Sequence, residues 1–218
     1  MSLVDGPTRE IFVVDDDPSA REAIASLLKP AGFRVTLFAD GASAIDAARA
    51  TPLACIVLDL HMPGGSGLEV LVQLDARHYA APIIVVSGHS DVPGVVEAIK
   101  LGAFDYIEKS RAREALVPGV RDAIAAATKR AGEPGTASRP LPAFPGASAL
   151  TPREHEVLAH IVDSASNKEA ATRLGISRRT VEIHRAHIMH KLGAKNSVDL
   201  MRIVFGRPQD ARPSRMSA

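Results

Sequence analysis

The sequence has a single cysteine, no tryptophan and only 4% aromatic residues among its 218 positions. One cysteine excludes an internal disulfide framework, and its place in an apolar segment makes Cys55 a buried structural thiol. No apolar run approaches the roughly 18 residues of a membrane-spanning helix, and no charged start leads into such a run at the N-terminus. We therefore expect a soluble, cytoplasmic protein without a membrane partner, whose core consists of alanine, valine, isoleucine and leucine.

Charge is unevenly distributed, although the formal net charge is only +1. Residues 1–149 hold 14 Lys and Arg against 18 Asp and Glu, whereas residues 150–218 hold 12 against 7. This asymmetry indicates an acidic domain followed by a basic domain with a polyanionic partner. The composition predicts a first domain over 8–130, a Pro/Gly-rich linker over 131–147, a second domain over 148–207 and a polar tail over 208–218.

Five short strand-like segments alternate with helical segments in the first domain. We expect strands over 11–14, 33–38, 54–59, 82–87 and 104–108, and helices over 18–29, 40–50, 66–76, 91–101 and 112–129. This alternation predicts an α/β fold with a parallel sheet covered by helices on both faces. Five strands fit the flavodoxin-like (βα)5 order 2-1-3-4-5, which places a ligand crevice between the first and third strands.

Carboxylates stand at the carboxyl ends of the first and third strands. Asp15 and Asp16 follow the first strand and Asp59 ends the third, so that all three are expected in one crevice. Asp17 is better suited to cap the next helix than to act as a ligand. Three neighbouring carboxylates repel one another unless a cation compensates, and hard oxygen ligands favour Mg²⁺.

Ser87 and Lys109 end the fourth and fifth strands on the same edge of the sheet. A carboxylate beside Mg²⁺ can accept a phosphoryl group as an acyl phosphate, while Lys109 neutralises the transferred oxygens and Ser87 donates to one of them. Taken singly, Ser87 fits a turn residue and Lys109 a solvated charge. Because both share an edge with Asp59, the set favours phosphoryl chemistry.

The second domain is expected to be a small all-α unit of four helices. Thr151, Ser166 and Ser177 are suited to cap the first three, and the fourth is expected over 197–205. A short glycine-bearing turn joins the two middle helices, as in a DNA-binding helix-turn-helix. The candidate DNA contacts are Asn167, Lys168, Arg178, Arg179, Thr180, Glu182, Ile183, Arg185, Ala186, Lys191 and Lys195.

The longer helix of this pair carries two further patterns. Val181 and Ile188 are expected to face the domain core, which leaves the positions between them for the DNA groove. Three histidines, His184, His187 and His190, recur at three-residue spacing, so metal binding is conceivable. No cysteine or carboxylate joins them, and packing or phosphate contact is the favoured interpretation.

These motifs resemble two known families. The segments VVDDD (13–17), LDLHMP (58–63) with SG (66–67), SGH (87–89) and GAFDYIEK (102–109) resemble the receiver domain of two-component response regulators. The segments LTPRE (150–154), NKE (167–169), LGIS (174–177) and RTVEIHR (179–185) resemble a LuxR-type helix-turn-helix. The pair in this order is similar to the NarL/FixJ subfamily.

The resemblance implies the chemistry of the acidic site. Asp59 would accept a phosphoryl group from a sensor histidine kinase. Asp16, Asp59 and the backbone carbonyl of His61 would bind Mg²⁺, with Asp15 completing the shell through water. The implied function is phosphorylation-dependent binding of double-stranded promoter DNA as a homodimer. The protein would not be an enzyme, apart from slow self-dephosphorylation.

The resemblance also implies a conformational switch. Ser87 and Tyr106 would be the switch pair, and Lys109 would contact the phosphoryl group. One departure concerns the residue after this lysine, where the family often has a proline in a cis peptide. Here it is Ser110, and a cis bond before a non-proline residue costs about 3 kcal/mol, so a trans peptide is expected.

Two functions of other classes compete with this interpretation. An aspartyl-phosphate hydrolase of the haloacid dehalogenase type also uses a strand-end aspartate, Mg²⁺ and a lysine, but it needs a second carboxylate two residues later, where this sequence has His61. A phosphate-independent receiver that only dimerises is the second alternative. The presence of the complete acidic set, with Ser87 and Lys109, argues against it.

Overall fold

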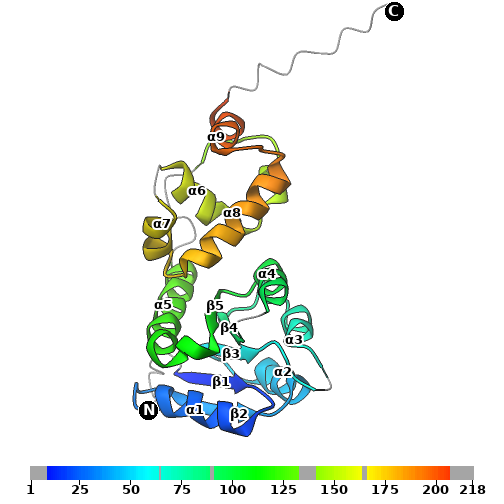
Figure 1. The fold of residues 1–218 in the computed structure, drawn as a ribbon, viewed down its shortest axis with the longest axis vertical. Coiled ribbons are helices and arrows are strands. Elements are labelled where there is room, and N and C mark those ends of the chain that lie inside the picture. Colours follow the sequence, from blue (N-terminus) through cyan, green and yellow to red (C-terminus); the bar gives the residue numbers. More distant parts are fainter. Residues whose placement is uncertain (1–8, 64, 89–90, 133–140, 164–165, 207–218) are drawn as a thin grey trace, which may run out of the picture.

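The computed structural model describes residues 9–63, 65–88, 91–132, 141–163 and 166–206 (Figure 1). Residues 133–140 of the expected linker and the tail expected over 208–218 lie outside this range. Five strands form one sheet, β1 (Glu10–Val14), β2 (Arg34–Phe38), β3 (Cys55–Asp59), β4 (Ile83–Ser87) and β5 (Asp105–Glu108). All neighbouring strands are parallel, in the order β2-β1-β3-β4-β5. The predicted order is therefore confirmed.

The central strands are apolar without alternation because helices cover both faces of the sheet. Successive side chains of a strand point to opposite faces. In β1, Ile11 and Val13 join one buried cluster, whereas Phe12 and Val14 join another. Helices α1 (Pro18–Leu28) and α5 (Ala112–Gly132) contribute to the first cluster, and α2 (Gly41–Ala50), α3 (Gly67–Gln73) and α4 (Val92–Leu101) to the second.

Helix α3 ends three residues before the predicted position, at Gln73. Asp75 adopts a left-handed conformation with φ 47°, which an aspartate tolerates better than most residues. The Ala76 N–H then donates to the Leu71 carbonyl at 2.9 Å, and the Asp75 N–H donates to the Val72 carbonyl at 3.0 Å. This pair of bonds is a Schellman motif, which satisfies the last carbonyls of the helix.

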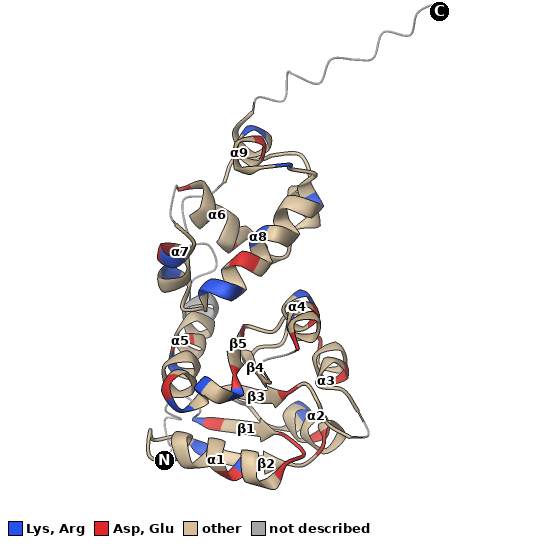
Figure 2. Ribbon diagram, in the orientation of Figure 1, with Lys and Arg blue, Asp and Glu red and all other residues tan. Residues whose placement is uncertain are grey.

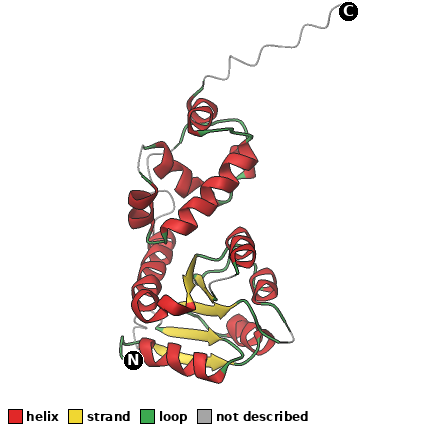
Figure 3. Ribbon diagram, in the orientation of Figure 1, coloured by secondary structure: helices red, strands yellow, loops and turns green. Residues whose placement is uncertain are grey.

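The second half is helical, as Figure 3 shows, with α6 (Pro152–Val162), α7 (Asn167–Leu174), α8 (Arg178–Leu192) and α9 (Ser197–Phe205). The predicted caps are present. Thr151 and Ser166 form capping boxes with Glu154 and Glu169, and the Ser177 hydroxyl accepts from the Thr180 N–H. Two short 3-10 turns, η1 (Lys109–Arg111) and η2 (Ala147–Ala149), complete the elements of the described residues.

The two halves share a continuous apolar core. One buried cluster combines sheet residues such as Val57 with residues of the second half such as Val157 and Leu200. Helix α8 packs against α4, and Figure 1 shows the second half stacked on the end of the first that carries α4, β5 and α5. Among the described residues, none of the helices combines the length and apolarity needed to cross a membrane.

Candidate functional site

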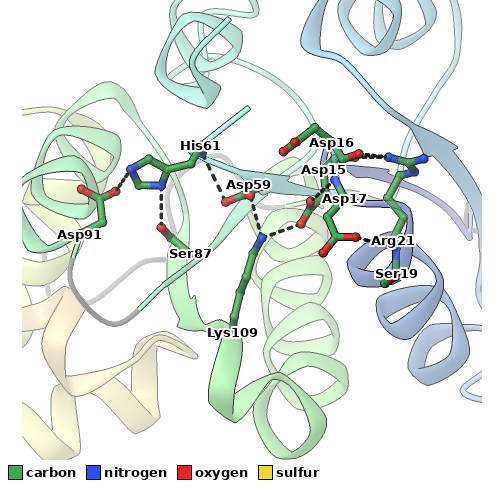
Figure 4. Close-up of polar contacts among 10 residues, drawn as sticks. All are labelled: Asp15, Asp16, Asp17, Ser19, Arg21, Asp59, His61, Ser87, Asp91 and Lys109. Carbon is green, nitrogen blue, oxygen red and sulfur yellow. Dashed lines mark hydrogen bonds and ion pairs between the residues drawn. The ribbon is translucent and has the colours of Figure 1, made fainter. Parts of the chain in front are cut away.

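The sheet topology brings three carboxylates together at one edge (Figure 4). Val14 of β1 pairs with Leu58 of β3, so the residues that follow them are neighbours. Asp15, Asp16 and Asp59 each offer a carboxylate oxygen, and these oxygens lie within 4.8 Å of one another. Asp15 and Asp59 are 1% and 4% exposed, whereas Asp16 is more open to solvent.

Lys109 from the end of β5 reaches across the sheet edge to two of these carboxylates. Its Nζ lies 2.7 Å from Asp59 Oδ2 and 2.9 Å from Asp15 Oδ2. Burial acts to lower the pKa of Lys109, but the bonds and charges of Asp59 and Asp15 outweigh it, so that its pKa is raised. One ammonium therefore faces two buried carboxylates, with a third carboxylate beside them.

The peptide after this lysine differs from the family pattern as expected. No peptide bond is cis within the part of the chain that the structure describes, so the bond between Lys109 and Ser110 is trans. A 3-10 turn begins directly at Lys109, and the Ser110 hydroxyl donates to Glu108 Oε1 at 2.5 Å. Lys109 reaches Asp59 without a proline to shape the loop.

Close backbone packing and an arginine hold the loops around the site. A Cβ added at Gly67 would lie 2.2 Å from the Asp59 carbonyl oxygen, so only glycine lets α3 begin so near the end of β3. Arg21 of α1 donates to the carbonyls of Asp15 and Asp16 at 2.6 and 2.8 Å. Sequence reasoning missed Arg21; its position one turn into the helix that follows the carboxylates was the available signal.

The acidic cluster has the ligand chemistry that Mg²⁺ requires. Three carboxylates offer oxygens at close range, and one of them is partly open, which leaves room for water in the coordination shell. The single ammonium of Lys109 compensates only part of their charge. The described residues contain no other group of three or more possible His, Cys, Asp or Glu ligands at this spacing.

The His61 side chain forms a link that sequence reasoning also missed. Its Nδ1 lies 3.4 Å from the Ser87 hydroxyl, and its Nε2 lies 3.5 Å from Asp91 Oδ2, beside the start of α4 (Figure 4). Its backbone N–H lies 3.4 Å from Asp59 Oδ1. His61 stands two residues after Asp59, where the sequence of a haloacid dehalogenase would have its second carboxylate, and its imidazole contacts Ser87 at the end of β4.

Tyr106 lies half-buried on β5, one residue beyond Asp105. Burial raises the pKa of its hydroxyl, and the charges of Glu108 and Asp91 add to the effect. Ser87 is fully buried at the end of β4. The two residues of the expected switch pair therefore lie on the neighbouring strands β4 and β5.

The basic residues of the helix-turn-helix divide into two groups. Figure 2 shows a basic segment at the start of α8, where the Arg178 and Arg179 side chains are 71% and 52% exposed. Lys168, Ala186 and Lys195 are also exposed. These residues are available to a partner without rearrangement of the second half.

Other candidate contacts are bonded within the second half. Lys191 Nζ lies 2.7 Å from Glu154 Oε2. Burial acts to raise the pKa of Glu154, but the contact with Lys191 and the bonds from Thr151 outweigh it, so that its pKa is lowered. Arg185 donates to Asn167 Oδ1 at 3.4 Å and to the Ser197 hydroxyl. Lys191 and Arg185 therefore stabilise the second half through these contacts.

Glu182 is held in the same way by its own helix. Arg178 Nε lies 3.0 Å from its Oε1, and Arg179 Nη1 lies 3.9 Å from its Oε2. A carboxylate that reads a cytosine amino group would have to turn away from Arg178, which donates to it along the helix.

Two family models match the chain. The response regulator receiver domain matches residues 11–121, and the bacterial regulatory proteins of the luxR family match residues 148–204. The chain belongs to the NarL/FixJ subfamily of response regulators. Its first half is a receiver domain and its second a LuxR-type domain, so it belongs to a family of transcription regulators and not of enzymes.

Similar proteins share both halves. The transcriptional regulatory protein FixJ of Bradyrhizobium diazoefficiens is 38% identical over 197 residues, which cover 89% of this chain and 94% of that protein. The transcriptional regulatory protein TdiR of Thauera aromatica is 35% identical and covers 92% and 87%. The structure of the response regulator StyR matches with a TM-score of 0.51 at 33% identity, over 89% of this chain and 97% of that one.

In this response regulator the receiver covers part of the recognition helix α8. Thr180 is fully buried, and its hydroxyl donates to Asp105 Oδ1 of the receiver at 2.5 Å. Ile183 is 5% exposed and joins the receiver cluster that contains Val95 and Ile99. Two of the residues predicted to face DNA therefore face the receiver in this conformation.

The three histidines of α8 lie in different surroundings. His184 is 4% exposed, and burial, followed by the charge of Arg153, lowers its pKa to about 3. Burial also lowers the pKa of His187, whereas His190 is exposed at the helix end. His184 borders a cavity between the two domains, which Phe104 and Arg153 also line. Its position favours packing over a shared metal.

Proposed function

We propose that this protein is a phosphorylation-dependent regulator of transcription in which Asp59 receives the phosphoryl group from a sensor histidine kinase. The contact of Lys109 with Asp59, beside Asp15 and Asp16, carries this proposal. A carboxylate at a strand end, close to a fixed ammonium and to further oxygen ligands, has the parts that phosphoryl transfer requires.

The transfer uses the residues as follows. An oxygen of the Asp59 carboxylate attacks phosphorus, the P–N bond of the phosphohistidine breaks, and its electron pair stays on the imidazole. Lys109 exchanges its contact with Asp59 for one with a phosphoryl oxygen. Mg²⁺, when bound by Asp16, Asp59 and the His61 carbonyl with Asp15 acting through water, would neutralise charge on the transferred oxygens.

We further propose that phosphorylation separates the domains. Ser87 moves toward the phosphoryl group, and Tyr106 turns inward into the space that it leaves. This movement changes the surface of α4 and β5, on which α8 packs. The freed LuxR-type domain then binds double-stranded promoter DNA as a homodimer, because two linked half-sites bind far more tightly than one.

The two partners, a signalling kinase and chromosomal promoter DNA, place this function in the cytoplasm. Lys168, Arg178, Arg179, Arg185, Lys191 and Lys195 supply the phosphate contacts, and Asn167 adds a polar one. Thr180, Glu182, Ile183 and Ala186 complete the surface that meets DNA after the domains separate. Phosphate contacts fix the position of the helix, while base contacts select the sequence.

The first experiment measures covalent labelling. The full chain is incubated with radiolabelled acetyl phosphate, with Mg²⁺ or with a chelator. We expect label only with Mg²⁺, and none on Asp59→Asn. Asp75→Asn, an exposed aspartate outside the site, serves as the matched control and should label like the wild type. Label retained on Asp59→Asn would refute the site assignment.

The second experiment measures DNA binding. Selection from a random duplex pool, with the protein treated or untreated with the phosphodonor, should yield an enriched operator only after treatment. Equal enrichment in both conditions would instead support a receiver that acts without phosphate, as a dimerisation module. Rapid turnover of a phosphomonoester would revive the hydrolase alternative.

A further inference from the structure

The first turn of α8 holds a carboxylate from the receiver domain. The Ser177 N–H donates to Asp105 Oδ2 at 2.9 Å, and the Thr180 hydroxyl donates to Asp105 Oδ1 at 2.5 Å. The Tyr106 N–H donates to the same Oδ1 at 2.7 Å. Asp105 is only 6% exposed, so its carboxyl group is almost fully withdrawn from water.

The donors around this carboxylate are neutral N–H and O–H groups. Burial raises the pKa of Asp105, and the bonds from Thr180, Tyr106 and Ser177 act in the opposite direction. An anion held by backbone N–H and hydroxyl donors at a helix N-terminus is the arrangement by which proteins bind phosphate. The contact therefore has the chemistry of an anion site.

Three basic residues lie near this anion site. The exposed Arg178 and Arg179 follow Ser177 directly, and Lys168 and Arg178 line a groove together with Asp105 and Asp122. Helix-turn-helix proteins turn the start of the second helix toward DNA, and helix N-termini are common donors to DNA phosphates. Once the receiver has moved away, an anion from outside the protein would meet the same donors that Asp105 now occupies.

We propose that the first turn of α8 is a binding site for a backbone phosphate of DNA, and that the Asp105 carboxylate occupies it as an internal mimic of that phosphate. The inference rests on the proposed function, because it needs the second half to bind DNA. Asp105 and the phosphate compete for the Ser177 N–H and the Thr180 hydroxyl. The conformation in which α8 is docked on the receiver therefore cannot bind DNA through these two donors.

Substitution of this aspartate tests the competition. In Asp105→Asn one oxygen becomes an NH₂ group, so the side chain can no longer accept on both sides, and a donor would face a donor. A buried donor without its acceptor is costly enough to shift the equilibrium between docked and separated domains roughly tenfold toward separation. We expect unphosphorylated Asp105→Asn to bind a random-sequence DNA duplex about tenfold more tightly than the wild type.

The matched control removes a charge from the same region without removing the contact. Asp122 of α5 is exposed and lies beside Gly175 in the turn before α8. Asp122→Asn changes the net charge by the same amount as Asp105→Asn, and we expect its DNA affinity to stay within twofold of the wild type. Fluorescence anisotropy at one fixed salt concentration measures all variants, because non-specific binding depends on salt.

A third variant separates phosphate mimicry from simple opening of the domains. Thr180→Val removes the hydroxyl that both the carboxylate and the phosphate would use. We expect it to weaken DNA binding several-fold both in the phosphorylated protein and in the Asp105→Asn background. A DNA affinity unchanged by Thr180→Val in both backgrounds would refute the shared site, and Asp105→Asn binding no more tightly than Asp122→Asn would refute the competition.

The outcomes also separate this inference from the proposed function. If phosphorylated wild type binds DNA while Asp105→Asn gains nothing, only the inference fails. If neither phosphorylated wild type nor any variant binds DNA, the proposed function fails. Urea unfolding confirms that each variant is folded, and Asp105→Ala replaces Asp105→Asn if the latter does not fold, with the same tighter binding expected.

Discussion

Acidification should loosen the LuxR-type domain through His184. This side chain is buried at the boundary between the domains, and its Nε2 has no hydrogen-bond partner among the described residues. Burial and the nearby Arg153 oppose a second positive charge there, which lowers the pKa of His184 to about 3. In the unfolded chain the same imidazole titrates near its ordinary value of about 6.5.

The two pKa values determine the sign and the size of the pH dependence of stability. Because the folded pKa lies below the unfolded one, the stabilisation is complete above about pH 6.5 and is lost as the pH falls toward about 3. Between pH 7 and pH 5 the unfolded imidazole takes up a proton that the folded one does not. The free energy of opening should therefore fall by about 2 kcal/mol over this interval.

Hydrogen exchange of the α8 amides, corrected for the intrinsic pH dependence of exchange, measures this free energy. The full chain is compared with His184→Phe, which keeps a ring but cannot titrate, and with His190→Phe on the exposed end of the same helix. We expect the 2 kcal/mol difference in the wild type and in His190→Phe, and most of it to vanish in His184→Phe. An equal pH dependence in all three proteins would refute the reasoning.

Three further predictions concern the acidic site and the second domain. Gly67→Ala places a Cβ against the Asp59 carbonyl; urea unfolding should show a loss of about 3 kcal/mol, and unchanged stability would contradict the close packing. Lys109→Gln removes the ammonium at Asp59; labelling by acetyl phosphate should slow about 100-fold, and an unchanged rate would contradict its role. Lys191→Met leaves the buried Glu154 carboxylate without its cation; hydrogen exchange in α6 should show a loss of about 2 kcal/mol, which Glu154→Gln in the same chain should largely restore.

Local signals in the sequence were sufficient for most of the fold. Unbroken apolar runs predicted strands covered on both faces, and the strand order followed from the number of alternating units. The meeting of Asp15 and Asp59 was predictable because parallel strands end at a common edge. The end of α3 was not, because a left-handed Asp75 depends on how the chain turns back on Leu71, and no glycine marks that turn.

The docking of the two domains lay beyond these signals. Helical periodicity placed Ile183 on the surface away from the domain core, and an apolar residue there was compatible with a DNA groove. In the structure that surface packs on α4. Asp105 at the start of β5 was a second indication of the docking. An aspartate in a covered strand needs hydrogen-bond partners, and these can come from another domain. Asp105 finds its partners in α8.

The position of Asp105 suggests how a small chemical change can release a domain. Asp105 begins the four-residue β5 strand and Lys109 follows its end, so the acidic site and the docking contact lie about 13 Å apart along one strand. To change a population from 1% to 99% open requires about 5.5 kcal/mol. A tenfold effect of Asp105 is about 1.4 kcal/mol of this total. The packing of Ile183 on the receiver and the Arg153 guanidinium over the Phe104 ring, at 4.7 Å, are further contacts between the domains that oppose opening. Loss of any one contact should therefore activate the protein only in part. The proposed movement of β5, which carries Asp105 and Tyr106 and directly follows Phe104, would weaken several contacts at once.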